Sequence, residues 1–172
     1  HTYSVARTVP SYLVSIEGKT ASLFATSARI GGLVAGHDAD VVNALTNYGT
    51  AFGMVFQIVD DILDVIATDA ELGKRAGHDM EEGVYTLPVL LTLAQQSSDS
   101  DELRSFLGKP LSQTERERAL VIVRAHAGIQ SAIESANNYV HMAETECDRM
   151  PQGVATDALR AAPAALLASI IR

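Results

Sequence analysis

The sequence lacks tryptophan and contains a single cysteine, and aromatic residues make up only 5% of its 172 residues. One cysteine, Cys147, excludes an intrachain disulfide and is typical of a protein in a reducing, cytoplasmic compartment. No apolar run is a clean candidate for crossing a bilayer, since even segment 155–171 contains charged residues and Pro163. Hydrophobic residues nevertheless make up 47% of the chain. This composition favours helix-on-helix packing, and we expect residues 1–172 to form one domain.

Positive charge is also scarce, because 13 basic residues face 21 acidic ones and leave a net charge of −8. That balance argues against nucleic acid as a partner. The negative charge is concentrated in residues 60–82, where eight acidic residues against Lys74 and Arg75 leave −6. An acidic segment that includes two basic residues favours a divalent cation with an anionic ligand over a solvated acidic surface.

No segment alternates apolar and polar residues as a strand would, so we predict an all-α fold. Residues that favour helix ends divide the chain: Gly36 at a C-terminus, and Asp38, Thr86 and a Ser112–Glu115 capping box at N-termini. Segment 68–83 is expected to be a loop or a set of short turns. The expected helices span about 9–35, 39–67, 88–96, 101–107, 112–127, 128–149 and 154–171.

The acidic helix segment Phe56–Asp64 is the strongest chemical signal in the sequence. At about 100° per residue, one arc of roughly 100° holds four polar side chains: Gln57, Asp60, Asp61 and Asp64. Ionised carboxylates among apolar residues repel one another and resist desolvation, so a cation must offset the cost. Carboxylates without histidine or cysteine at zinc spacing suit Mg²⁺, which shares its coordination shell with water and phosphate oxygens.

Two of the lysines that follow a glycine, Lys19 and Lys74, are candidate phosphate ligands. Lys74, in the segment Gly73–Asp79, can bind phosphate as a point charge within a tightly folded loop, although the segment alone resembles an ordinary charged loop. Lys19 follows Gly18 in an otherwise apolar helix, where a lysine can also simply extend to solvent. The glycine spacing and the absence of a preceding strand exclude a nucleotide-binding P-loop.

Gly49 and Gly53 lie inside the second expected helix, where each costs roughly 1 kcal/mol relative to alanine. Two interpretations remain open. The glycines allow close helix packing, or they leave room for a bulky ligand beside the acidic face.

In order along the chain, these motifs resemble the trans-isoprenyl diphosphate synthases. The segments that carry the resemblance are Gly18–Ala21, Phe56–Asp64, Gly73–Asp79 and Glu82–Pro88, and the later helices are compatible with it. The resemblance implies an all-α isoprenoid synthase bundle around a central cavity. It also implies Mg²⁺-dependent condensation of an allylic diphosphate with isopentenyl diphosphate, and a homodimer with peripheral membrane contact when the product is long.

The resemblance also implies a role for each matching residue. Asp60 and Asp64 would hold Mg²⁺, with Asp61 in support. Lys19 and Lys74 would bind the allylic diphosphate. Two further side chains, Thr20 and Gln57, would offer oxygen dipoles along the path of the allylic cation, and Asp79 would orient the Lys74 loop or its metal-bound waters.

The chain departs from the family pattern in two ways. It contains only what resembles the second of two aspartate-rich motifs, and Val84 stands where many members have a basic residue. Because the chain also begins at His1 without an initiator methionine, we expect the C-terminal half of a longer synthase, inactive alone. The alternatives are a non-catalytic partner subunit, which typically loses its metal aspartates, and a terpene cyclase.

Overall fold

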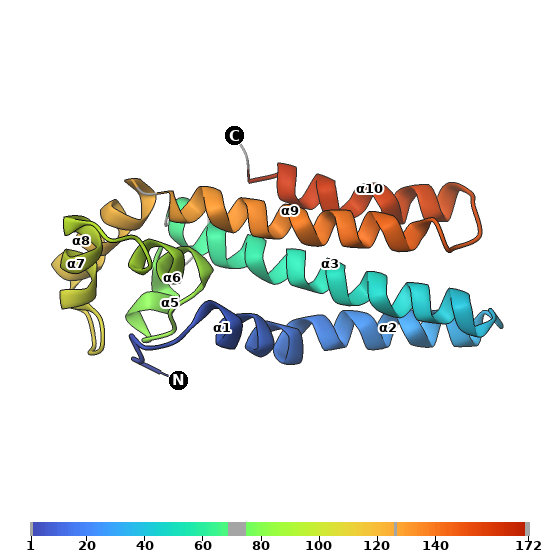
Figure 1. The fold of residues 1–172 in the computed structure, drawn as a ribbon, viewed down its shortest axis with the longest axis horizontal. Coiled ribbons are helices and arrows are strands. Elements are labelled where there is room, and N and C mark those ends of the chain that lie inside the picture. Colours follow the sequence, from blue (N-terminus) through green and yellow to red (C-terminus); the bar gives the residue numbers. More distant parts are fainter. Residues whose placement is uncertain (1, 69–74, 126, 171–172) are drawn as a thin grey trace. The chain divides into compact units, whose positions relative to one another are not determined.

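A computed structural model describes residues 2–68, 75–125 and 127–170. Within these residues all regular structure is helical and no strand is present, so the all-α prediction is confirmed (Figure 1). The elements are α1 Val9–Ile16, the π-helical turn η1 Glu17–Ala21, α2 Ser22–Val34, α3 Ala39–Ile66, α5 His78–Glu81, α6 Leu87–Leu93, α7 Ser98–Phe106, α8 Gln113–Ala125, α9 Gly128–Cys147 and α10 Val154–Ala168.

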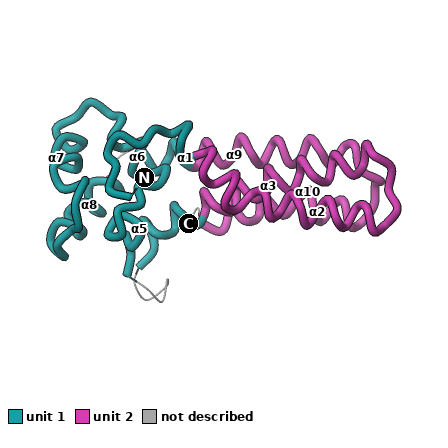
Figure 2. The backbone as a smooth tube through the Cα atoms, turned by 90° about the horizontal axis from the view of Figure 1, so that it is seen from below, with its two compact units in different colours: residues 1–12, 60–132 teal, residues 13–59, 133–172 magenta. Residues whose placement is uncertain are grey.

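The chain forms two compact units, coloured separately in Figure 2. Unit 1 comprises His1–Tyr12 and Asp60–Ala132, and unit 2 comprises Leu13–Val59 and Ile133–Arg172. Three helices, α1, α3 and α9, therefore contribute residues to both units. The expectation of one domain over residues 1–172 stays a prediction.

The first expected helix ends at Gly36 as predicted, but a π turn changes its register. Gly36 has a φ of 73°, and its N–H donates to the Leu33 carbonyl at 3.1 Å, which closes α2 with the left-handed residue expected there. The prediction of one helix over residues 9–35 is confirmed for residues 9–34, except that the π turn η1 within it was not expected. A π turn adds a residue to one helical turn and leaves no compositional mark.

The second expected helix is confirmed as α3. The Asp38 carboxylate accepts the Val41 N–H at 3.0 Å, which is the predicted N-terminal cap. The helix then runs without interruption to Ile66. Because it is this long, α3 contains residues of both units.

Unit 1 contains the short helices, and their caps explain where they begin. The Ser112–Glu115 capping box forms before α8, with the Ser112 N–H donating to Glu115 at 2.9 Å. A second box, in which Ser97 and Ser100 exchange hydrogen bonds, starts α7 at Ser98 rather than at the predicted residue 101. Thr86 occupies the N-cap position of α6 with extended backbone but makes no side-chain cap.

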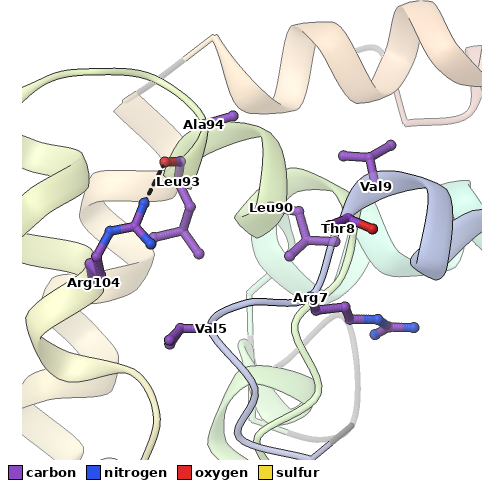
Figure 3. A pocket seen from close by; sticks show the side chains of 8 residues that line it. All are labelled: Val5, Arg7, Thr8, Val9, Leu90, Leu93, Ala94 and Arg104. Carbon is purple, nitrogen blue, oxygen red and sulfur yellow. Dashed lines mark hydrogen bonds between the residues drawn. The ribbon is translucent and has the colours of Figure 1, made fainter.

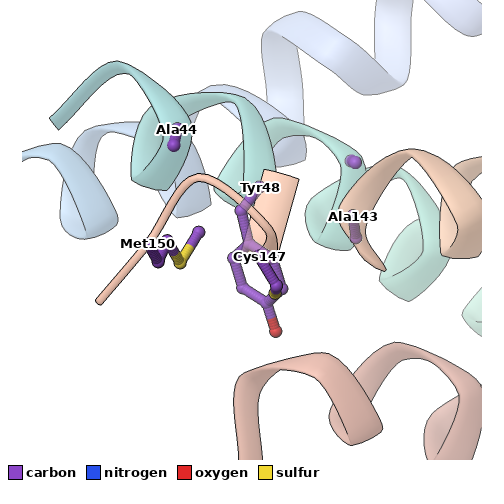
Figure 4. Close-up of a cluster of buried hydrophobic side chains, with 6 residues drawn as sticks. Ala44, Tyr48, Ala143, Cys147 and Met150 are labelled. Atoms are coloured by element: carbon purple, nitrogen blue, oxygen red, sulfur yellow. The ribbon is translucent and has the colours of Figure 1, made fainter. Parts of the chain in front are cut away.

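Unit 2 has a core of small side chains and one buried phenol (Figure 4). Ala44, Ala143 and Cys147 are fully buried against Tyr48, whose hydroxyl donates to the Leu159 carbonyl at 2.7 Å. Burial, reinforced by the nearby Cys147 thiol, raises the pKa of Tyr48 to about 12. The hydrogen bond joins α3 to α10, while the alanines let α3 and α9 approach closely.

Among the described residues, no helix combines the length and apolarity that crossing a membrane requires.

Candidate functional site

The C-terminal end of α3 carries the three predicted carboxylates in two different environments. Asp60 is exposed, whereas Asp61 and Asp64 are each only 3% exposed. Burial of two ionisable side chains on successive turns is costly unless each is hydrogen-bonded or paired. The partners of these two carboxylates therefore define the site.

Asp61 is bonded to a phenol that the sequence analysis did not select. The Tyr12 hydroxyl donates to Asp61 Oδ2 at 2.6 Å, and Tyr12 is only 1% exposed. The Arg7 guanidinium carbon lies 5.4 Å from the centre of the Tyr12 ring. Tyr12 precedes Asp61 by 49 residues, and no sequence signal links them.

Asp64 anchors the segment around Gly77 and Asp79. Its backbone carbonyl accepts the Gly77 N–H at 2.7 Å, and its carboxylate oxygen Oδ2 accepts the Asp79 N–H at 3.2 Å. Gly77 adopts a φ of 73°, a conformation that glycine favours, and a Cβ there would lie 3.0 Å from Leu120. Asp79 thus contacts the acidic motif through its backbone, while the predicted role of its side chain stays a prediction.

Two arginines that the sequence analysis missed hold the chain just after Asp64. The Arg124 Nε donates to the Val65 carbonyl at 2.6 Å, at the end of α3. Arg116 is 6% exposed and donates to the Ala76 carbonyl at 2.8 Å. The Val65 carbonyl lies at the C-terminal end of α3, where a cationic donor is favourable, whereas the Ala76 carbonyl lies in the turn before α5. Both arginines lie in α8, where the sequence reads as an ordinary amphipathic helix.

Thr20 and Gln57 form a second group within unit 2. The Thr20 hydroxyl donates to Gln57 Oε1 at 2.7 Å, and the Gln57 side chain is 7% exposed. Lys19, the neighbour of Thr20 in η1, is exposed. The structure thus pairs the two residues that were expected to offer oxygen dipoles.

Gly49 and Gly53 serve helix packing. A Cβ on Gly53 would lie 2.6 Å from the Cα of Ala21, and one on Gly49 would lie 2.7 Å from the Phe24 carbonyl oxygen. Both positions face η1 and α2, so the close-packing interpretation is confirmed. These glycines allow the backbone of α3 to lie directly against the segment that carries Thr20.

The predicted residues divide between the two units. Unit 1 contains the four acidic residues Asp60, Asp61, Asp64 and Asp79, and unit 2 contains Lys19, Thr20 and Gln57. Within the units the structure joins Asp64 to Asp79 and Thr20 to Gln57. Lys74 lies outside the described residues.

The carboxylates fit a hard divalent cation by their chemistry, since all are oxygen donors. Among the described residues, no three histidine, cysteine or acidic side chains converge as a metal site. Carboxylates along one helix face supply one or two ligands each, and Mg²⁺ characteristically takes its remaining ligands from water and substrate phosphates. Asp60 is exposed, whereas the buried Asp61 accepts the Tyr12 hydroxyl.

Each unit also has a pocket away from these residues. In unit 1, Val5, Arg7, Leu93 and Arg104 are among the residues lining a pocket of about 200 Å³ (Figure 3). Arg104 there donates to the Leu93 carbonyl at 2.9 Å. A pocket of about 340 Å³ in unit 2 includes Glu17. Neither pocket is lined by a predicted site residue that the structure describes.

Comparison with known proteins identifies the family. Residues 1–123, well over half of the chain, match the family described as polyprenyl synthetase. The chain belongs to the polyprenyl synthetase family. The resemblance drawn from the motifs is thereby confirmed, and the matched residues include both described groups.

The similar proteins are prenyl diphosphate synthases about twice as long. The geranylgeranyl diphosphate synthase of Saccharolobus solfataricus is 40% identical over 84% of this chain and 44% of its own length. Component 2 of the heptaprenyl diphosphate synthase of Bacillus subtilis is 31% identical over 92% of this chain and 45% of its own.

A solved structure of the Corynebacterium glutamicum geranylgeranyl pyrophosphate synthase, complexed with calcium and isoprenyl diphosphate, superposes with a TM-score of 0.87 at 34% identity. The match covers 94% of this chain and 51% of that one. The chain therefore spans about half the length of the relatives it matches.

Proposed function

We propose that this chain forms the second aspartate-rich half of a polyprenyl diphosphate synthase active site. The parent enzyme would condense an allylic diphosphate with isopentenyl diphosphate. The observation that carries the proposal is the acidic end of α3, where exposed Asp60 lies beside the buried, hydrogen-bonded carboxylates of Asp61 and Asp64. Membership of the polyprenyl synthetase family supports a role for that arrangement in prenyl diphosphate condensation.

The first step of such a reaction breaks the allylic C–O bond and places negative charge on the leaving diphosphate. Bound Mg²⁺ would neutralise part of that charge. Asp60 and Asp64 would hold the ion, while Tyr12 keeps Asp61 fixed in support. A similar protein crystallised with calcium and isoprenyl diphosphate supports the use of a divalent cation. Lys19 and Lys74 would bind the diphosphate.

The allylic cation then adds to the double bond of isopentenyl diphosphate, and a proton is lost. Thr20 and Gln57 suit this stage because oxygen dipoles stabilise a passing cation in a water-poor site. The Thr20 hydroxyl proton already points to Gln57 Oε1, so the lone pairs of the Thr20 oxygen face elsewhere. Thr20 thus acts as an acceptor dipole.

We also propose that the complete enzyme contains a further helical half. Support comes from the outward face of α2, where four aliphatic side chains are each more than half exposed: Leu23, Ile30, Leu33 and Val34. The hydroxyls of Thr26 and Ser27 on the same face donate to carbonyls of their own helix. Exposed aliphatic side chains gathered on one face of a helix are typical of a surface that another element covers.

The assembly and location expected from the sequence stay predictions. They comprise a homodimer, a cytoplasmic compartment, and peripheral membrane contact for long products. The similarity to a protein named component 2 adds a heteromeric assembly as a second arrangement. The relatives named as synthases do not favour a terpene cyclase.

An activity assay tests the proposal. The family-length protein containing this chain is incubated with labelled isopentenyl diphosphate, an allylic diphosphate and Mg²⁺, and the products are separated by chain length. We expect elongated prenyl diphosphates, and no turnover when a chelator removes the cation. Turnover that persists in the chelator would contradict the metal assignment.

A further inference from the structure

The helix that carries Lys19 and Thr20 changes register at η1. Ile16 and Ala21 are buried at 5% and 0% exposure, yet they lie five residues apart, whereas an α-helical face repeats every three or four. The Ser22 N–H donates to the Glu17 carbonyl, five residues back, as a π turn requires. Compared with an uninterrupted α-helix, the extra residue rotates the following side chains by about 100° about the helix axis.

This register change decides where Thr20 lies. In an uninterrupted α-helix, Thr20 would follow Ile16 by four residues and would take the buried position against α3. The π turn gives that position to Ala21 instead. Thr20 lies beside it, where its hydroxyl reaches Gln57 Oε1 at 2.7 Å.

Two features stabilise the π turn from different sides. On the solvent side, the Ser22 hydroxyl donates to the Gly18 carbonyl at 2.8 Å, inside the turn. On the α3 side, Gly53 lets the backbone at Ala21 approach so closely that an added Cβ would lie 2.6 Å from the Ala21 Cα. A backbone atom cannot move aside as the tip of a side chain can.

We propose that Gly53 and Ser22 are positioning residues that maintain the π turn and so hold the Thr20 hydroxyl on Gln57. The inference rests on the proposed function for its catalytic consequence, because Thr20 and Gln57 act on the allylic cation there. Its structural part, the dependence of the Thr20–Gln57 bond on Gly53 and Ser22, stands by itself.

The simpler alternative is that Gly53 only permits helix packing, and Gly49 is the matched control that separates the two. A Cβ on Gly49 would meet the Ala25 Cα at 2.8 Å, so Gly49→Ala and Gly53→Ala introduce the same kind of backbone clash. Gly49 lies one turn farther from Gln57. Both variants should lose stability, but only Gly53→Ala should disturb Thr20.

The decisive readout is the side-chain amide resonance of Gln57 in the ¹⁵N-labelled protein. Thr20→Val, which removes the hydroxyl, defines the resonance position without the hydrogen bond. We expect Gly53→Ala to move the resonance at least halfway to that position and Gly49→Ala to leave it near wild type. An equal shift in both variants, or no shift in Gly53→Ala, would overturn the proposal.

Ser22→Ala provides a second test if Gly53→Ala fails to fold. Ser27 is its matched control, because the Ser27 hydroxyl donates to the Leu23 carbonyl at 2.8 Å within regular α-helix. Both serines are exposed. We expect Ser22→Ala to shift the Gln57 resonance toward the Thr20→Val position and Ser27→Ala to leave it unchanged. A wild-type resonance in Ser22→Ala would contradict the proposal.

Turnover measurements in the family-length protein separate this inference from the proposed function. Gly53→Ala should lower kcat roughly tenfold to a hundredfold more than Gly49→Ala, with the KM for the allylic diphosphate within about twofold of wild type. If the wild-type protein has no condensation activity but the resonance shifts occur, the proposed function fails while the positioning role holds. If activity is present without the shifts, the positioning role fails alone.

Discussion

The buried carboxylate of Asp61 accepts a hydrogen bond from the buried phenol of Tyr12, so each polar group has a partner. The Tyr12–Asp61 hydrogen bond is 2.6 Å long and lies almost entirely out of solvent. A hydrogen bond to a charged acceptor is stronger than a neutral one. This bond keeps Asp61 in one orientation beside the exposed carboxylate of Asp60.

We predict that Tyr12→Phe destabilises the protein, because it leaves the buried Asp61 carboxylate without this donor. The free energy of unfolding should fall by about 1–3 kcal/mol. Urea denaturation of the two proteins measures the difference. Tyr3→Phe is the control, since its hydroxyl makes only a 3.3 Å bond to the Glu81 carbonyl. Equal losses in both variants would show that Asp61 does not depend on Tyr12.

The Glu115 carboxylate should make stability depend on pH. Hydrogen bonds from Lys109 and Ser112 lower the pKa of Glu115 from its usual 4.5 to about 2. A pKa that is lower in the folded state stabilises the fold above pH 4.5, and the contribution disappears as pH falls toward about 2. The melting temperature of Glu115→Gln should therefore lie below wild type at pH 6 and converge with it between about pH 4.5 and pH 2.

The matched control for that titration is Glu117→Gln in the same helix. Glu117 accepts a hydrogen bond from the neutral side chain of Gln113 rather than from a lysine such as Lys109. Its melting curve should stay closer to wild type. A constant difference between Glu115→Gln and wild type over the whole pH range would contradict the assigned pKa.

At the scale of single residues, the sequence pattern was enough to single out the carboxylates of α3. It did not reveal the residues that bond to them. The acidic residues stand out because charge interrupts an apolar helix. Tyr12 and Arg116 carry no such contrast, and their bonds join residues 49 and 40 positions apart. Contacts of that kind depend on how helices pack, which one sequence does not record.

Among the elements, α2 offers two adjacent glycines with opposite environments. A Cβ on Gly31 would meet nothing within 4 Å, whereas one on Gly32 would lie 2.8 Å from Leu45 Cδ1. We predict that Gly31→Ala stabilises the protein by up to about 1 kcal/mol through helix propensity, and that Gly32→Ala gives a smaller gain or a loss because Leu45 must move. Chemical denaturation measures both differences. An equal or larger gain from Gly32→Ala would contradict the packing described at Gly32.

Helix ends could be predicted from the sequence because their chemistry is local. Asp38, Gly36 and the Ser112–Glu115 box act on backbone groups within four residues. The π turn could not be predicted, because it depends on the packing of Ala21 against α3. The start of α7 could not be predicted either, because its capping box uses two serines in place of the usual serine and glutamate.

For the whole molecule, family membership and length define what this chain contributes. It belongs to the polyprenyl synthetases and spans about half the length of the relatives named above. The acidic end of α3 and the Thr20–Gln57 pair are the parts of the proposed site that it provides. Its exposed apolar face on α2 is accounted for by the further half proposed above.

The most direct test of the central claim is turnover of the family-length protein with Asp60→Ala, compared with Asp40→Ala. Both residues are exposed acids on α3, but Asp40 lies in its first turn, away from the acidic motif. We predict that Asp60→Ala lowers kcat by roughly 10²-fold or more without unfolding the protein, because a ligand of the diphosphate-neutralising ion is lost. Asp40→Ala should retain wild-type turnover. Wild-type turnover in Asp60→Ala would contradict the account.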